Sequence, residues 1–168
     1  HDYDSLGYTE FILDEYSDSL YLEVTKTDSS QRYFTLHGIS LETSDPGVVY
    51  HSIGINGANV TSFLRCNLFS QHLNILHPDW IIISLGTNDA YVKNLKTGIV
   101  YRNFETLISI IRKDFPETPI LLTYPGDHYR FRKYPNPNTE SMCKILENVA
   151  KKHHCAIWNL CEILGGKG

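Results

Sequence analysis

The chain has 168 residues, of which 42% are hydrophobic, 20% charged and 12% aromatic. This composition is typical of globular domains and excludes a disordered chain, so we expect about one folded domain with an appended piece. The sequence contains 15 Lys and Arg residues against 19 Asp and Glu residues, a net charge of −4. Because no basic stripe is present to neutralise phosphates, nucleic acid is not expected as a partner.

The sequence shows no membrane span and no targeting segment. The longest apolar runs, residues 80–83 and 120–122, are the length of strands and far shorter than the roughly 18 residues of a membrane helix. The chain begins with His1 and has no signal-peptide pattern, so we expect it to be a piece of a longer protein. The four cysteines, Cys66, Cys143, Cys155 and Cys161, include no C-x-x-C pair. We expect them to be buried free thiols, with one disulfide as the alternative if the protein is exported.

The first part of the chain, residues 1–45, alternates short polar and apolar runs. Residues 8–13, 20–25 and 32–37 are rich in Tyr, Phe, Thr and Val, and polar turn residues separate them. This pattern predicts antiparallel strands of a sandwich. Since three strands alone are marginally stable in water, we expect further strands of that sandwich before residue 1. Residues 1–45 are therefore interpreted as the end of an accessory β-sandwich with a possible carbohydrate-binding role.

After the break at Ser44-Asp45-Pro46-Gly47, residues 46–168 alternate strands with helical patterns. Strands are expected over residues 48–53, 80–85, 120–124 and 155–160, with amphipathic helices between them. Asn138 is expected to cap the last of these helices. The alternation predicts an α/β domain, a flavodoxin-like doubly wound parallel sheet with helices on both faces. In such sheets ligands bind beyond the carboxyl ends of the strands.

Two loops at that edge carry the residues of interest. Gly54-Ile55-Asn56-Gly57-Ala58 follows the first strand, and Gly86-Thr87-Asn88-Asp89 follows the second. Neither fits a phosphate-binding glycine pattern. The Asn88 amide beside a glycine N–H has the chemistry of an oxyanion hole. The alternative is structural, in which the glycines only permit helix entry and Asn88 and Asp89 cap the following turn.

The segments 52–58 and 82–89 resemble the second and third sequence blocks of the SGNH (GDSL-type) hydrolases. The resemblance implies that Gly57 supplies a backbone N–H, and Asn88 a side-chain N–H, to the oxyanion of a serine esterase. We also expect Asn56, Asp89, His128 and Tyr129 to contact substrate. Neither a cofactor nor a metal is implied, and no His, Asp or Glu spacing in the sequence suggests a metal site.

Two departures from that family pattern affect the expected chemistry. No Gly-Asp-Ser nucleophile block occurs, and the nearest serines are Ser5 in Asp4-Ser5-Leu6 and Ser19 in Asp18-Ser19-Leu20. No Asp-x-x-His base block occurs either. The arrangement resembles bacterial peptidoglycan O-acetylesterases in which a carbohydrate-binding-module-like domain is inserted after the nucleophile. We therefore expect a central fragment that is itself inactive, its nucleophile and base lying outside the chain, from a periplasmic or secreted enzyme.

Other candidate residues have competing interpretations. His128 follows Asp127, and adjacent residues do not easily form the Asp-to-His hydrogen bond of a catalytic triad, so a substrate contact is preferred to a role as base. The aromatic residues of the region around His128 fit either a wall for a sugar or packing against their own domain: Tyr124, Tyr129, Phe131 and Tyr134.

The leading hypothesis is a serine esterase that removes acetyl or other short acyl groups from a carbohydrate polymer such as peptidoglycan. The alternative is a non-catalytic carbohydrate-binding protein on a degenerate hydrolase fold. A flavodoxin-like or receiver domain also fits the alternation of strands and helices, but it leaves Gly86-Thr87-Asn88-Asp89 unexplained. The sequence predicts no particular oligomeric state.

Overall fold

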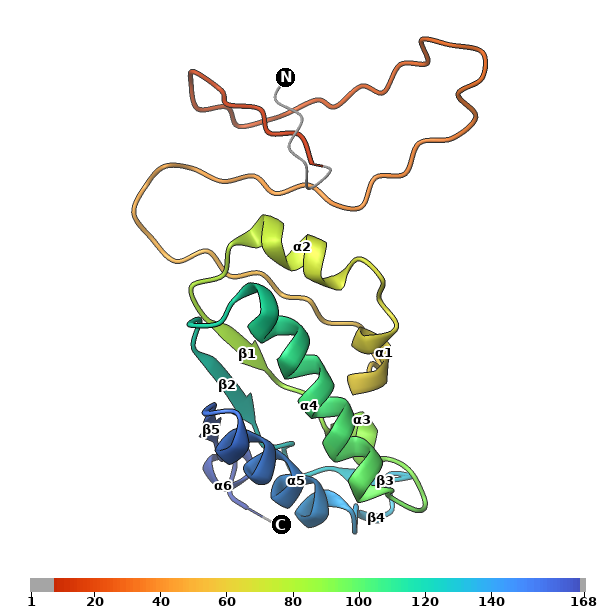
Figure 1. Ribbon diagram of the computed structural model, residues 1–168, viewed down its shortest axis with the longest axis vertical. Coiled ribbons are helices and arrows are strands. Elements are labelled where there is room, and N and C mark those ends of the chain that lie inside the picture. Colours follow the sequence, from red (N-terminus) through yellow and green to blue (C-terminus); the bar gives the residue numbers. More distant parts are fainter. Residues whose placement is uncertain (1–7, 167–168) are drawn as a thin grey trace. The chain divides into compact units, whose positions relative to one another are not determined.

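The computed structural model describes residues 8–166, and its contacts divide the chain into two units, His1–Ile53 and Gly54–Gly168 (Figure 1). The change of residue pattern in the sequence placed the domain division after residue 45, and that assignment stays a prediction. Among the residues that the structure describes, all the helices and strands belong to the second unit.

The three strands expected over residues 8–37 do not form. Residues 8–53 have no regular element beyond one isolated bridge residue, and almost every side chain there is exposed. Local hydrogen bonds hold short turns instead, such as Ser30 N–H to Asp28 Oδ1 at 2.7 Å. The physical reason is that a strand needs paired neighbours and a covered face, and three short strands supply too little of either.

The second unit contains eleven helices and strands in the described residues. Its helices are α1 (Val60–Leu64), α2 (Phe69–Leu76), α3 (Thr87–Ala90), α4 (Thr97–Asp114), α5 (Thr139–Lys152) and α6 (Leu160–Ile163); its strands are β1 (Ile81–Ile83), β2 (Ile120–Thr123), β3 (Tyr129–Arg130), β4 (Tyr134–Pro135) and β5 (Ala156–Trp158). None of these helices has the length and hydropathy of a membrane span.

The main sheet is parallel, in the order β1-β2-β5, as Figure 1 shows. Ile83 pairs with Leu122, and Leu122 pairs with Ile157, so the carboxyl ends of the three strands meet at one edge. Antiparallel strands β3 and β4 form a separate hairpin. The predicted α/β fold with a parallel sheet is confirmed, as are the strands near residues 80–85, 120–124 and 155–160.

The expected first strand, residues 48–53, is not formed, and β1 pairs only with β2 in the described part of the chain. This changes how the sheet is covered. Right-handed crossovers that proceed in one direction, from β1 through β2 to β5, place their helices on the same face. Helices α4 and α5 accordingly pack against each other, while Ile82 and Trp158 on the opposite face are 50% and 43% exposed.

The core lies between the sheet and helices α1, α4 and α5. Phe104, Leu107, Ile108 and Ile111 recur at helical spacing on α4 and are buried. They pack with Met142 and the other apolar residues of α5 against Ile83, Ile120 and Leu122 of the sheet. This core holds in place the loops that leave the carboxyl edge of β1.

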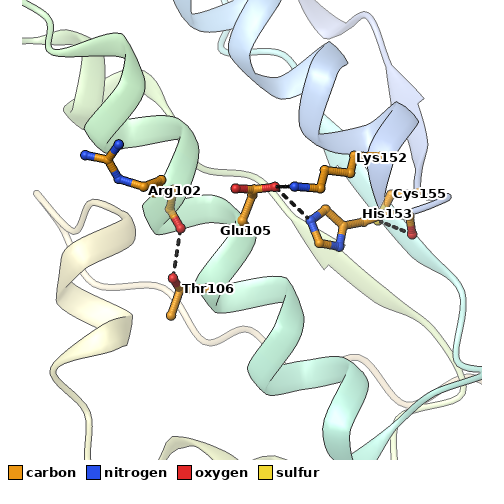
Figure 2. A network of polar contacts seen from close by, with 6 residues as sticks. All are labelled: Arg102, Glu105, Thr106, Lys152, His153 and Cys155. Carbon is orange, nitrogen blue, oxygen red and sulfur yellow. Dashed lines mark hydrogen bonds and ion pairs between the residues drawn. The ribbon is translucent and has the colours of Figure 1, made fainter.

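A polar contact joins α4 to the end of α5 (Figure 2). The Glu105 carboxylate of α4 lies 2.5 Å from the Lys152 ammonium and 3.5 Å from the His153 ring. Its side chain is 18% exposed. The hydrogen bond from Lys152 holds the pKa of Glu105 below its usual value, against the opposing effect of desolvation. Glu105 thus fixes the end of α5 through Lys152 and His153.

Candidate active site

The first loop of the candidate site is a tight turn over residues 55–58. Ala58 N–H donates to Ile55 O at 3.0 Å, and Gly57 has φ = 79°. A positive φ at the third position is what a type II turn requires, and glycine adopts it without strain. The predicted need for glycine at position 57 is thereby explained, and Asn56 is exposed beside it.

The second loop leaves β1 and turns at once into α3. Gly86 precedes α3 with φ = 122°, and its backbone is buried against α5. A Cβ at this position would lie 3.2 Å from Met142 Cγ and 3.6 Å from Leu146 Cδ1. Gly86 therefore has two reasons to be glycine, the backbone angle and the closeness of α5, and both are structural.

Asn88 links the two loops. Its Nδ2 atom donates to Ala58 O at 2.8 Å, and the residue is exposed. Because a carbonyl oxygen only accepts, this contact fixes which end of the amide faces the turn. The second N–H of the same amide has no hydrogen-bond partner within residues 8–166. Asn88 is therefore held next to the Gly57 turn, with one donor still available for a ligand.

Asp89 faces the protein interior. Its residue is 7% exposed, and its two carboxylate oxygens accept from Val60 N–H at 3.2 and 3.3 Å. Desolvation raises the pKa of Asp89, and the hydrogen bonds from backbone N–H groups oppose that rise. Asp89 thereby connects the first residue of α1 to α3. Asn88 connects the preceding turn to α3 through Ala58 O. The side chain of Asn59 completes the start of α1 by accepting from Ser62 N–H.

A recess of about 320 Å³ opens beside Asn88. Asn59 and Asn88 form part of its polar wall, and Val92, Leu95 and Ile99 form part of its apolar wall. The recess therefore combines hydrogen-bonding groups with room for a small apolar group.

His128 is held on both sides of its ring. Its Nδ1 atom lies 3.0 Å from Gly126 O, and its Nε2 atom lies 2.7 Å from Asn136 Nδ2. A carbonyl and an amide N–H at these positions require Nδ1 to donate and Nε2 to accept. Both nitrogens are thus engaged within the protein, and the arrangement favours a structural role over one as a base.

Asn136 and Asn138 were not expected to act at the site. The Nδ2 atoms of both residues donate to Ala90 O, at 3.0 and 2.9 Å, and Asn138 also donates to Val92 O. Asn138 stands at the start of α5 as predicted, but its side chain makes no capping bond there. Its amide is used instead to hold the end of α3. The sequence feature that could have indicated this role is the alternating Pro135-Asn136-Pro137-Asn138, because Asn after Pro often serves turn geometry.

The remaining predicted residues lie at scattered positions. Tyr129 is 47% exposed on β3, and Tyr124 is partly buried against the core. Ser5 lies outside the described residues, and Ser19 belongs to the first unit. Cys66 is exposed rather than buried, and the other three cysteines are partly buried; none of the four forms a disulfide among the described residues. Within residues 8–166 no group of three His, Cys, Asp or Glu side chains is arranged to hold a metal ion.

Known proteins resemble this chain in sequence pattern and in fold. The model of the GDSL-like lipase/acylhydrolase family matches residues 18–168. A solved peptidoglycan O-acetylesterase is similar in structure, with a TM-score of 0.63 and 21% identity over 69% of this chain and 35% of that one. A lipase/acylhydrolase from Enterococcus faecalis has a TM-score of 0.52 and 22% identity over 64% of this chain and 54% of that one. No curated protein matches. The chain thus spans about a third to a half of the length of these solved relatives.

Proposed function

Because the chain belongs to the GDSL-like lipase/acylhydrolase family, we propose that it supplies the oxyanion hole of a serine esterase. The Gly57 N–H and the second N–H of Asn88 are the two donors. Both would hydrogen-bond to the oxygen that becomes negative when a nucleophile adds to the ester carbonyl. The observation that carries the proposal is the hydrogen bond from Asn88 Nδ2 to Ala58 O, which places the amide beside the residue that follows Gly57.

This arrangement suits a preorganised site. One N–H of Asn88 is anchored on the turn, and Asp89 anchors the start of α1 behind it. Donors that are already fixed need no reorganisation as charge develops, which is how an oxyanion hole lowers the barrier. The nucleophilic serine and the base histidine are proposed to lie outside this chain, since neither Gly-Asp-Ser nor Asp-x-x-His occurs in it.

The proposed substrate is a carbohydrate polymer, such as peptidoglycan, that carries acetyl or other short acyl groups. The recess lined by Val92, Leu95 and Ile99 is proposed to take the acyl group. Of the four residues predicted to contact substrate, Asn56 and Tyr129 are exposed, whereas Asp89 and His128 make internal hydrogen bonds. A substrate of this kind also implies a periplasmic or secreted enzyme.

The test is an Asn88→Ala substitution in the polypeptide that carries this chain together with the catalytic serine and histidine. We expect kcat to fall about 10²–10³-fold with little change in KM, because the donor acts on charge that exists only in the transition state. Release of acetate from O-acetylated peptidoglycan and hydrolysis of p-nitrophenyl acetate are the assays. An exposed Asn67→Ala variant, between α1 and α2 and outside that recess, is the control and is expected to retain kcat.

The alternative function is non-catalytic carbohydrate binding on a degenerate hydrolase fold. The specific observation that favours it is the absence of both catalytic blocks from the 168 residues. If the complete polypeptide also lacks them, binds saccharide and hydrolyses no ester, the alternative is correct. If Asn88→Ala lowers the Tm while activity per folded molecule stays constant, Asn88 is a structural tie and the esterase proposal loses its main support.

A further inference from the structure

The hairpin of β3 and β4 ends in an unusual turn. Lys133 N–H donates to Arg130 O at 3.1 Å, and the two residues between them, Phe131 and Arg132, have φ of 54° and 58°. A two-residue turn with positive φ at both positions is normally made by Asn-Gly. A phenylalanine and an arginine are strained in this conformation. The contacts of the Phe131 ring indicate why a large side chain occupies this strained position.

Phe131 is the centre of an aromatic surface made from two distant segments. Its ring lies edge-to-face with Tyr91, at a centroid distance of 6.0 Å, and with Tyr134, at 6.4 Å. The three residues are 42% to 59% exposed. Tyr91 was not among the aromatic residues predicted to act together, because it lies 40 positions before Phe131 in the chain. We call Tyr91, Phe131 and Tyr134 the aromatic tip.

The aromatic tip is rigidly held. The Tyr91 hydroxyl accepts from Phe131 N–H at 2.8 Å, which joins the end of α3 to the hairpin. The carbonyls on either side of Tyr91 are held as well, since Ala90 O accepts from Asn136 and Asn138, and Val92 O accepts from Asn138. Exposed rings that are fixed before a ligand arrives lose little entropy on binding.

Positive charge accompanies these rings. The Arg130 guanidinium carbon lies 5.2 Å from the centre of the Phe131 ring. Arg130 is 8% exposed, and its Nε atom has no hydrogen-bond partner among the described residues. Arg132 and Lys133 follow in the turn, and Asp127 lies three residues before Arg130. A buried guanidinium with an unpartnered N–H is costly, so an anionic group at the aromatic tip would be stabilised by the guanidinium charge.

We propose that the aromatic tip and Arg130 form a subsite for a sugar residue that carries a carboxylate. The apolar C–H face of the sugar ring packs on the exposed aromatic rings, and the carboxylate pairs with the guanidinium. The inference rests on the proposed function, because it assigns a charged saccharide as the substrate class. The subsite lies next to the proposed oxyanion donor, because Tyr91 N–H donates to Asn88 O at 3.2 Å.

The experiment is a titration of the chain, followed by NMR, with two sugars that share one ring. N-acetylmuramic acid differs from N-acetylglucosamine only by a lactyl ether that bears a carboxylate. We expect the acidic sugar to shift the resonances of Tyr91, Phe131 and Arg130 and to bind at least tenfold more tightly than the neutral sugar. D-Lactate alone is the third ligand. If lactate produces the same shifts with the same affinity, the site is a simple anion site and the proposal is wrong.

Substitutions separate binding from folding. Phe131→Gly removes the ring but accepts the positive φ, so we expect the Tm to stay constant or rise while affinity for the acidic sugar falls at least tenfold. Tyr50→Ala removes an exposed tyrosine from the first unit and is expected to leave binding unchanged. If Phe131→Gly lowers the Tm and binds the sugar as the unmodified chain does, the ring only packs and the proposal is overturned.

Charge is tested with Arg130→Gln, which should bring the affinity for the acidic sugar down to that for the neutral sugar. Because Arg130 is buried, a second variant, Arg132→Gln, removes a positive charge from the exposed turn. Its charge-matched control is Lys113→Gln on α4. Failure of this inference and failure of the esterase proposal are distinguishable. Ester hydrolysis without preference for the acidic sugar overturns only the subsite, and tight acidic-sugar binding without hydrolysis overturns only the esterase.

Discussion

Asp89 is a buried carboxylate whose oxygens face a backbone N–H group. The pKa of such a group is raised by desolvation, so keeping it there has a cost. The benefit is local order, because Val60 N–H belongs to the first turn of α1 and has no partner within its own helix. We infer that Asp89 positions the turn that contains Gly57 relative to Asn88.

Asp89→Ala is expected to destabilise the chain by about 1–3 kcal/mol, because Val60 N–H would be left buried without an acceptor. Asp89→Asn should cost less, since the amide oxygen still accepts. Urea denaturation followed by tryptophan fluorescence measures both, with Trp80 and Trp158 as reporters in the same unit.

The control is Asp79→Ala, which removes an exposed carboxylate next to β1. If this variant is destabilised as much as Asp89→Ala, the hydrogen bond to Val60 is not the source of the effect. Equal losses for Asp89→Ala and Asp89→Asn would also contradict the interpretation, because only the first removes every acceptor.

At the scale of elements, α4 and α5 are held together by an apolar seam and by one partly buried ion pair. Surface ion pairs contribute little to stability, but Glu105 is only 18% exposed and contacts both Lys152 and His153. The Lys152 ammonium also lies over the Tyr101 ring at 5.9 Å, which adds a second contact between the same helices.

The folded state lowers the pKa of Glu105, so its contribution to stability is present above the unfolded pKa and is lost as the pH falls through the folded pKa. Glu105→Gln is therefore expected to lower the Tm most at neutral pH, and the difference from the unmodified chain should shrink as the solution is acidified below about pH 4. Thermal unfolding at several pH values measures this.

Glu140→Gln provides the matched comparison, since Glu140 pairs with Lys144 on the surface of α5 and is 59% exposed. Its Tm should differ little from that of the unmodified chain at any pH. A pH-independent loss of stability in Glu105→Gln would show that the carboxylate acts by packing and not by charge.

At the scale of the whole molecule, the chain as given is expected to hydrolyse no ester. Removal of either the serine or the histidine of a serine hydrolase costs on the order of 10⁶ in turnover, and this sequence has neither block. Incubation with p-nitrophenyl acetate should match a buffer blank. Turnover that survives purification and disappears in Ser19→Ala or Ser5→Ala would assign the nucleophile to this chain, and Ser19 is of interest because the family match begins at Asp18.

The sequence by itself determined the part of the fold that depends on local periodicity. Helices α4 and α5, strands β1, β2 and β5, and the glycine at position 57 could all be predicted from apolar spacing and turn chemistry. The loops with Gly57 and Asn88 were identified because strand ends of a parallel sheet meet at one edge. Each of these inferences uses residues close together in the chain.

Only the tertiary structure decided which distant groups meet. Residues 8–37 and 48–53 alternate like strands but form none, because a strand exists only with a paired neighbour. Helices α4 and α5 pack together against the same sheet residues, because the chain runs from β1 through β2 to β5 without reversing. Asp89 accepts from Val60, His128 pairs with Asn136, and Tyr91 joins Phe131. Long-range hydrogen bonds and ring contacts have no period in the sequence, so their partners become apparent only when the chain is folded.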